Sequence, residues 1–321
     1  MLCQDSTAGV MNGLCEAINK HTMYSADFIQ LRKNWLEYPA SRDLHDVETQ
    51  EWLHDTIKDV MVLHWNIFDW NIYLHWFDFR PYMKDKIEVK HFHGTMLRRS
   101  GKAELGRFKK TFVSTPDLLR YNEKYTLLPN PSYIPYDYEA TMPEDHTWIT
   151  HLPTQYVPYA KYMGLISHSE WYPQGWPPLA DCKGTDIFKE TMKDLSERFD
   201  WLKWTVPGKM TFRESIQYKS KITGYFSNLW AGNPGVNALE SMQMKKAIYA
   251  NISPYARMQY EDRMGEAPPL LQVERKTFHH DMKDHLRYAD HVETGQELYK
   301  WVNKYHGQKE VAKFYVEEVL G

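Results

Sequence analysis

The chain has 321 residues, of which 42% are hydrophobic and 25% charged, a balance typical of a folded globular protein. Its 39 Lys and Arg residues nearly cancel its 42 Asp and Glu residues, and the formal net charge of -3 makes nucleic acid, which is held by counterion release, an unlikely partner. Cys3, Cys15 and Cys182 contain no Cys-x-x-Cys pair, which disfavours a disulfide framework and a structural zinc site and indicates a reducing compartment.

The N-terminal part of the chain predicts helices. Residues 25–37 place apolar side chains at helical spacing and stop before Pro39. Residues 46–79 contain neither proline nor glycine, which predicts one long helix. Its second part, Val60 to Phe77, is apolar on nearly every side, with Asp69 its only formally charged residue. A helix of this kind is buried all round, so we expect a core or interface helix first, a helix on a membrane surface second and a membrane span last.

The remaining N-terminal elements are shorter. Residues 86–93 give the best strand pattern, and residues 115–128 predict a helix that starts at a Thr-Pro pair. Between them lies a basic segment that is best explained as a solvated face or as cations paired with an acidic neighbour. Less favoured is contact with phosphates, of lipid head groups at a membrane surface or of RNA. Its six cations are Arg98, Arg99, Lys102, Arg107, Lys109 and Lys110.

Residues 129–178 hold nine of the 17 prolines, interleaved with Tyr and Trp. Because a segment this aromatic has apolar surface to bury, we expect an extended arm that lies across a partner. Signals for helix starts then return. Four predicted helices each begin at a capping residue: 185–204, 211–230, 237 onward and 253–265. Three more helices are predicted within residues 275–320. The predicted fold is therefore mainly α and irregular, with regions 1–128, 129–184 and 185–321.

Motifs for catalysis are absent from the sequence: there is no phosphate-binding loop, dinucleotide fingerprint, nucleophile elbow or His-Glu-x-x-His. The best metal candidate is the His279–His285 cluster, in which two carboxylate and imidazole pairs share helical faces. Those four residues are His280, Asp281, Asp284 and His285. Histidines paired with neighbouring acids on a solvated face explain the pattern better, so no metal, cofactor or catalytic residue is predicted. The pair His64 and His75 predicts registry between helices rather than a proton path.

The composition resembles that of the accessory subunits of mitochondrial inner-membrane energy complexes. That resemblance implies a non-catalytic structural subunit of ATP synthase or the respiratory chain, bound peripherally to the inner membrane and to other protein subunits. The alternatives are a helical metal-dependent enzyme that uses His279–His285 and an RNA-associated, ribosomal subunit. In the first hypothesis the interface is aromatic and consists of Trp65, Phe68, Trp70, Trp76, Tyr133, Tyr136, Trp171 and Trp176.

Overall fold

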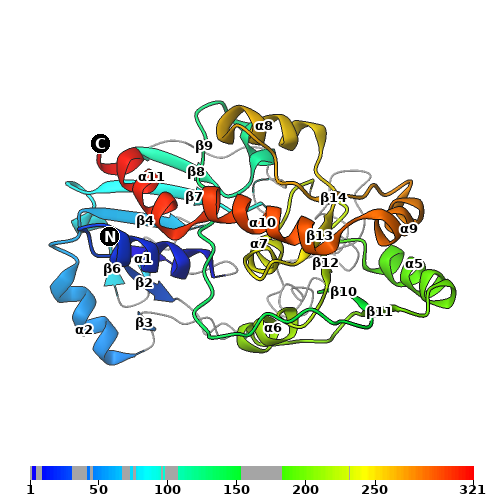
Figure 1. The fold of residues 1–321 in the computed structure, drawn as a ribbon. Helices are drawn as coiled ribbons and strands as arrows, with labels where there is room; N and C mark the ends of the chain where they lie inside the picture. The colour runs from blue at the N-terminus through cyan, green and yellow to red at the C-terminus, as the bar shows by residue number, and fades with distance from the viewer. Residues whose placement is uncertain are drawn as a thin grey trace, which may run out of the picture. The chain divides into compact units, whose positions relative to one another are not determined.

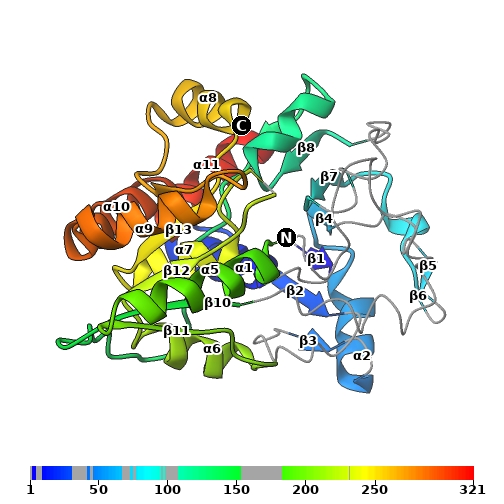
Figure 2. The same ribbon diagram turned by 90° about the vertical axis from the view of Figure 1, so that its right-hand side faces the viewer.

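The computed structural model describes residues 2–4, 9–30, 42–43, 46–66, 73–74, 77–94, 97, 108–152, 183–230 and 232–321. The chain divides into two compact units. Unit 1 comprises Met1–Tyr133 and Tyr305–Gly321, and unit 2 comprises Ile134–Lys304. Each unit is built around its own parallel β-sheet, with helices in the segments that connect the strands (Figures 1 and 2).

Unit 1 contains a seven-stranded sheet in the order β3-β2-β1-β4-β7-β8-β9, and every pairing in it is parallel. The strands are β1 (Leu2–Gln4), β2 (Asp27–Gln30), β3 (Arg42–Asp43), β4 (Val62–Asn66), β7 (Ile87–Phe92), β8 (Lys110–Val113) and β9 (Thr126–Leu127). The other elements are α1 (Val10–His21), α2 (Val47–Thr56), α11 (Gln308–Leu320), the hairpin β5 (Tyr73–Leu74) with β6 (Phe77–Asp78), and the 3-10 turns η2 (Arg80–Tyr82) and η3 (Pro116–Tyr121). Helices α1 and α11 pack side by side.

Unit 2 contains a five-stranded parallel sheet in the order β11-β10-β12-β13-β14. Its strands are β10 (Thr147–His151), β11 (Leu202–Thr205), β12 (Gly224–Phe226), β13 (Ala247–Ala250) and β14 (Leu271–Gln272). Its helices are α5 (Thr185–Arg198), α6 (Phe212–Lys219), α7 (Val236–Gln243), α8 (Pro254–Met264), α9 (Phe278–Tyr288) and α10 (His291–His306), the last of which ends in unit 1. Phe188 of α5 stacks on Phe226 of β12 in the core.

The prediction of a mainly α fold is wrong, because the sequence alternates strands and helices around parallel sheets. The predicted long helix 46–79 is in fact α2, followed by β4, β5 and β6. All five residues of β4 are buried, as expected for a strand that is covered on both faces of a parallel sheet. Such a strand lacks the polar and apolar alternation that marks an exposed sheet, so its apolar run is indistinguishable from a buried helix.

Other predicted helices were also strands in part. The segment 25–37 begins with β2, and 115–128 contains the turn η3 and strand β9. The predicted helices 185–204 and 211–230 each end in a strand, β11 and β12. The helices α8, α9, α10 and α11 and the strand β7 confirm the predictions for their segments. Of the predicted arm, residues 153–178 lie outside the described part of the chain, and β10 precedes them.

Candidate functional site

Strand order shows where each unit is able to bind a ligand. In an open parallel sheet, ligands bind beyond the carboxyl ends of the strands, at the point where the strand order reverses. This point, between two adjacent strands whose connections run in opposite directions, is the switch point. In unit 2 this position lies between β10 and β12, because β10 connects to β11 on one side and β12 lies on the other. In unit 1 the corresponding position lies between β1 and β4.

Helix α5 begins at the carboxyl end of β10. His151 is the last residue of β10, and Thr185 is the first residue of α5. Nε2 of His151 lies 2.9 Å from the hydroxyl oxygen of Thr185. Its Nδ1 lies 2.9 Å from the carbonyl oxygen of Phe226, which ends β12. Since a carbonyl can only accept, Nδ1 carries the proton and Nε2 accepts from Thr185. The imidazole therefore connects the first residue of α5 to β10 and β12, the two strands at the switch point.

The cap of α5 is a glycine that no other residue replaces without strain. Gly184 has a φ of 80°, in the left-handed region. A Cβ built on it would lie 2.7 Å from Cδ1 of Leu229, in the loop that follows β12. The N-terminus of α5 therefore contacts that loop. No capping side chain accepts hydrogen bonds from its first amides.

Helix α7 starts on the same loop. Its N-cap is Gly235, whose amide lies 3.5 Å from the hydroxyl of Ser227, the residue directly after β12. As a glycine, Gly235 also leaves the first amides of its helix without a capping side chain. Two helix N-termini, with their positive dipole ends, therefore meet the β12–α7 loop. This arrangement attracts an anion, because the first amide donors of a helix have no carbonyl partner one turn earlier within that helix.

A cation lies at the same edge. Lys183 donates from Nζ to the carbonyl oxygen of Leu152, at 3.0 Å, just beyond β10. Burial, followed by the charge of Lys183, lowers the pKa of His151 to about 3, so the imidazole is neutral at physiological pH. The ammonium groups of Lys183 and, more weakly, Lys189 act on this strand end, and that of Lys183 is suited to a phosphate group.

A buried ion pair joins α7 to α6. Lys219 of α6 and Glu240 of α7 form a buried pair whose side chains are 0% and 4% exposed. Lys219 also donates to the side-chain oxygen of Asn237, in the first turn of α7, at 3.0 Å. Burial raises the pKa of Glu240, and the charges of Lys219 and Lys183 oppose that shift. The pair fixes α7 against α6 and so positions the N-terminus of α7.

The loop after β12 is ordered by amide side chains. Asn228 donates from Nδ2 to the carbonyl oxygen of Asn233 at 2.9 Å, and Asn251, after β13, donates to the carbonyl oxygen of Leu229 at 2.9 Å. The guanidinium of Arg275 lies 4.1 Å from the ring centre of Trp230 in this loop. The Trp230 ring therefore lies between Arg275 and the core of unit 2, which fixes this part of the loop.

Unit 1 has a polar row at the carboxyl end of its strands. The Ser114 hydroxyl lies 2.9 Å from Nε2 of His91 and 2.5 Å from Nδ1 of His93, while His64 on β4 hydrogen-bonds through Nδ1 to the Tyr315 hydroxyl at 2.8 Å. Burial lowers the pKa of His64 and of His93 to about 3, and that of His91 well below its usual value. These imidazoles are neutral and act as hydrogen-bonding groups.

The predicted metal ligands do not converge. His280 pairs with Asp284 at 3.3 Å on the surface of α9, whereas Asp281 accepts from the Thr277 hydroxyl at 2.7 Å. His285 donates from Nε2 to the carbonyl oxygen of Gln272 at 2.7 Å. Among the described residues, no three His, Cys, Asp or Glu side chains are grouped to hold a metal ion.

The predicted aromatic interface falls mostly outside the described chain. Trp65 is 3% exposed, donates from Nε1 to Glu88 at 2.9 Å and packs edge-on against Phe79. Tyr133 and Tyr136 are half-buried, and the Tyr136 ring contacts Phe212. Residues outside the described ranges are Phe68, Trp70, Trp76, Trp171 and Trp176.

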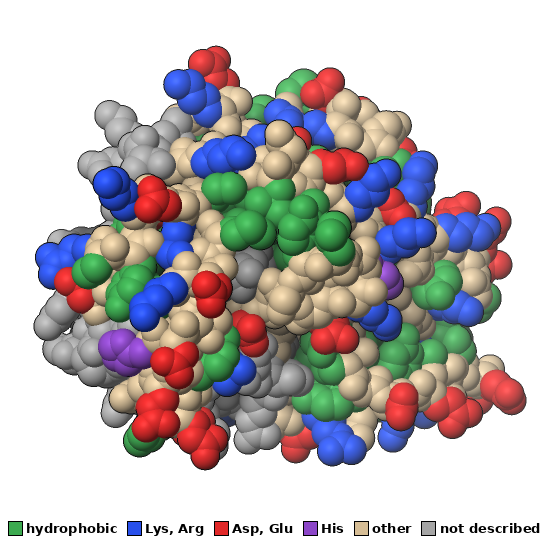
Figure 3. Space-filling view, turned by 90° about the vertical axis from the view of Figure 1, so that its left-hand side faces the viewer, with side chains coloured by type: hydrophobic (Ala, Val, Ile, Leu, Met, Phe, Trp, Pro, Cys, Tyr) green, Lys and Arg blue, Asp and Glu red, His purple; other side chains and the backbone are tan. Residues whose placement is uncertain are grey.

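Two of the six predicted basic residues can be placed. Lys109 donates to the carbonyl oxygen of Val319 at 3.0 Å, and Lys110 forms an ion pair with Glu318, so both are bound to α11. Arg98, Arg99, Lys102 and Arg107 lie outside the described residues. On the face drawn in Figure 3, basic and acidic side chains are interspersed. Within the described part of the chain, no helix combines the length and apolarity that a membrane crossing needs.

No protein-family model matches the sequence, and no curated protein sequence matches it. Among solved structures, sucrose-phosphate synthase from Thermosynechococcus elongatus matches with a TM-score of 0.56 and 11% identity, over 98% of this chain and 97% of that one. WaaB, a lipopolysaccharide outer core galactosyltransferase, matches with a TM-score of 0.52 and 10% identity, over 99% and 98%. HepE from Anabaena, solved in complex with UDP, matches with a TM-score of 0.51 and 10% identity, over 98% of each chain.

These matches overturn the hypothesis of a non-catalytic accessory subunit of ATP synthase or the respiratory chain, and with it the prediction that the chain is no enzyme. Two of the structures that share its architecture over nearly the whole length are a sucrose-phosphate synthase and a galactosyltransferase, which are enzymes. Among the described aromatic residues, Tyr225 and Tyr249 are both 0% exposed and belong to the core of unit 2. The chain therefore has the α/β fold of two parallel-sheet units called GT-B, the fold of many glycosyltransferases.

Sequence analysis missed Lys183, Gly184 and Gly235. Each glycine directly precedes a helix, α5 or α7. The signal available in the sequence was a glycine directly before each of these helical segments, at Gly184 and Gly235.

Proposed function

We propose that the chain is a glycosyltransferase that takes its sugar from a nucleoside diphosphate sugar and binds the diphosphate at the carboxyl edge of the unit 2 sheet. The observation that carries this proposal is the meeting of two glycine-capped helix N-termini with Lys183 at the switch point. Amide donors and one ammonium are the groups that bind a diphosphate. The likeness to sucrose-phosphate synthase, to the galactosyltransferase WaaB and to UDP-bound HepE supports the same chemistry.

In this reaction the bond between the anomeric carbon and the diphosphate oxygen breaks, and a bond from an acceptor hydroxyl oxygen to that carbon forms. The proton of the hydroxyl passes to the leaving diphosphate or to solvent, and the nucleoside diphosphate leaves with the bonding electrons. Negative charge therefore grows on the leaving diphosphate. The dipoles of α5 and α7 and the ammonium of Lys183 are fixed at the strand ends and stabilise that charge without reorganising.

The test is calorimetric titration of the full chain with UDP, GDP and ADP. We expect one of them to bind, and Lys183→Met to weaken that binding about 10- to 100-fold, because a hydrogen bond to a charged group contributes ~1.5–3 kcal/mol. The matched control is Lys193→Met, which removes an exposed lysine from α5, the helix that Lys183 precedes. If none of the three nucleotides binds, or if both variants bind as the wild type does, the proposal is wrong.

A further inference from the structure

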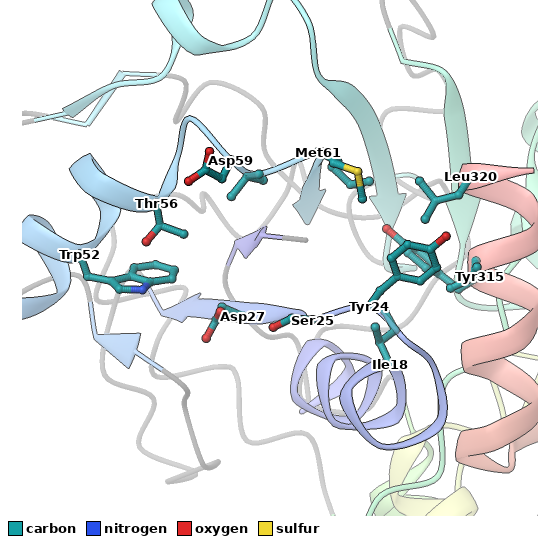
Figure 4. Close-up of a pocket in the computed structure, with 13 residues that line it drawn as sticks. Ile18, Tyr24, Ser25, Asp27, Trp52, Thr56, Asp59, Met61, Tyr315 and Leu320 are labelled. Atoms are coloured by element: carbon teal, nitrogen blue, oxygen red, sulfur yellow. The ribbon is translucent and has the colours of Figure 1, made fainter.

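A cavity of about 270 Å³ opens in unit 1 at the edge of the sheet opposite to the His91 and Ser114 row. It lies where β2 and β4 begin and where α1 and α2 end, and the C-terminal turn of α11 closes one side (Figure 4). Every residue that lines it belongs to unit 1. Because the switch point is at the other edge of the sheet, this cavity is separate from the site described above.

One end of the cavity is an aromatic platform. Trp52 of α2 lines it, and the guanidinium carbon of Arg42 lies 3.7 Å from the centre of the Trp52 ring. Nε of Arg42 also lies 3.7 Å from a carboxylate oxygen of Asp27. Arg42 does not itself line the cavity. One arginine therefore holds the indole ring and a carboxylate in place from outside the cavity, which makes both rigid before any ligand arrives.

The polar groups stand around this platform. Figure 4 shows the carboxylates of Asp27 and Asp59 on opposite walls, with the hydroxyl groups of Ser25 and Thr56 beside them. Asp59 and Ser25 are exposed. Two carboxylates and two hydroxyls next to an aromatic ring offer acceptors for several O–H donors at once.

The other end of the cavity is apolar. It is formed by Tyr24, Met61 and Leu320, and the Met61 side chain is 53% exposed. The hydroxyl of Tyr315, which also lines the cavity, is bonded to Nδ1 of His64. An exposed methionine beside aromatic rings is a surface that adapts to a ligand of irregular shape.

We propose that this cavity binds one neutral sugar ring of a glycan. A pyranose has an apolar face of C–H groups that stacks on an aromatic ring and a rim of hydroxyls that donate to carboxylates, which is the pattern that Trp52, Asp27 and Asp59 present. A cavity of roughly 150 Å³ holds a benzene ring, so 270 Å³ accommodates a single pyranose with its hydroxyls. A phosphate is excluded by repulsion from the two carboxylates.

A cation is the competing ligand, but charge argues against it. Asp27 already faces Arg42. Asp59 is close enough to Lys86 for its charge to act on the pKa of that lysine: burial lowers this pKa, and the charge of Asp59 opposes that effect. The two carboxylates are therefore compensated by neighbouring cations and accept hydrogen bonds from a neutral ligand without requiring a positive charge. Sugar binding here goes beyond the proposed transfer reaction and would give a glycan a second point of attachment.

The experiment titrates the full chain with maltotriose, cellotriose and chitotriose and follows binding by saturation-transfer NMR and calorimetry. We expect at least one to bind, Trp52→Ala to weaken it at least tenfold and Asp59→Asn to weaken it several-fold. Asp59→Asn is the variant to rely on if Trp52→Ala fails to fold, because Asp59 is exposed and Asn has the same shape. The matched control is Trp201→Ala, which removes a partly exposed tryptophan from unit 2 and should bind as the wild type does.

The proposal is overturned if no trisaccharide binds, or if the Trp52 and Asp59 variants bind sugar like the wild type. It is also overturned if tetramethylammonium, and none of the sugars, binds in a Trp52-dependent manner. A titration of the same samples with UDP, GDP and ADP keeps the two proposals apart. Sugar binding without binding of any of the three nucleotides would refute only the proposed function, and nucleotide binding without sugar binding would refute only this cavity.

Discussion

His151 should make the stability of the chain depend on pH. The side chain is 0% exposed, and burial with the charge of Lys183 lowers its pKa from 6.5 to about 3. In the unfolded chain the imidazole regains a pKa near 6.5 and takes up a proton below that pH, while the folded chain does not. Because the unfolded state then binds more protons, the stability associated with His151 is intact above pH 6.5 and falls as the pH falls toward 3.

The magnitude follows from the same two pKa values. A pH of 5.0 is 1.5 units below the unfolded pKa of 6.5, and each unit corresponds to about 1.36 kcal/mol. His151 should therefore lower the free energy of unfolding at pH 5.0 by ~2 kcal/mol relative to pH 7.5. The comparison is His151→Asn, whose side-chain amide can still donate to the carbonyl oxygen of Phe226 but does not titrate.

Urea unfolding of both proteins at pH 7.5 and 5.0, followed by circular dichroism, measures the difference. The wild type should lose about 2 kcal/mol more than His151→Asn between these pH values. Only the change with pH is compared, so the lower stability of the variant at pH 7.5 does not affect the result. Equal losses in the two proteins would refute the reasoning, because the imidazole would then titrate alike in the folded and unfolded chains.

Two substitutions test the positioning of the helices in unit 2. Lys219→Met leaves the buried carboxylate of Glu240 without its partner and should lower the free energy of unfolding by ~3–5 kcal/mol, and a Lys219→Met, Glu240→Leu double variant should recover most of it in thermal denaturation. Gly184→Ala combines a φ of 80° with a Cβ 2.7 Å from Leu229 and should cost about 2 kcal/mol or more. Gly208→Ala, where a Cβ meets nothing within 4 Å, should cost almost nothing, and similar losses for both glycines would contradict this account.

Helix starts with side-chain caps were predictable because their signals are local. The Thr211 hydroxyl and the Glu214 side chain form the capping box that the sequence indicates for α6. Ser253 caps α8 with a proline at its first position, as the Ser-Pro pair predicts. In both cases the bonding partners are within three residues of each other, so a short window contains the whole interaction.

Strands of the parallel sheets were not predictable in the same way. All three residues of β12 and all four of β13 are buried, so their apolar character shows no period of two. Because β12 follows the well-capped helix α6, its sequence predicts a continuation of that helix. Whether such a run forms a strand depends on neighbouring strands supplying backbone partners, as β10 and β13 do for β12.

The sequence alone determined the side-chain caps of α6 and α8, the helices from residue 254 onward and the strand 87–92, because each depends on residues close together in the chain. Only the tertiary structure decided the fold class and the site. Lys183 and the carbonyl oxygen of Leu152 are 31 residues apart in sequence, and Gly184 meets Leu229 only because β10 and β12 are adjacent. The grouping of two helix N-termini and a cation is a consequence of strand order, and strand order is a property of long-range pairing that no local pattern contains.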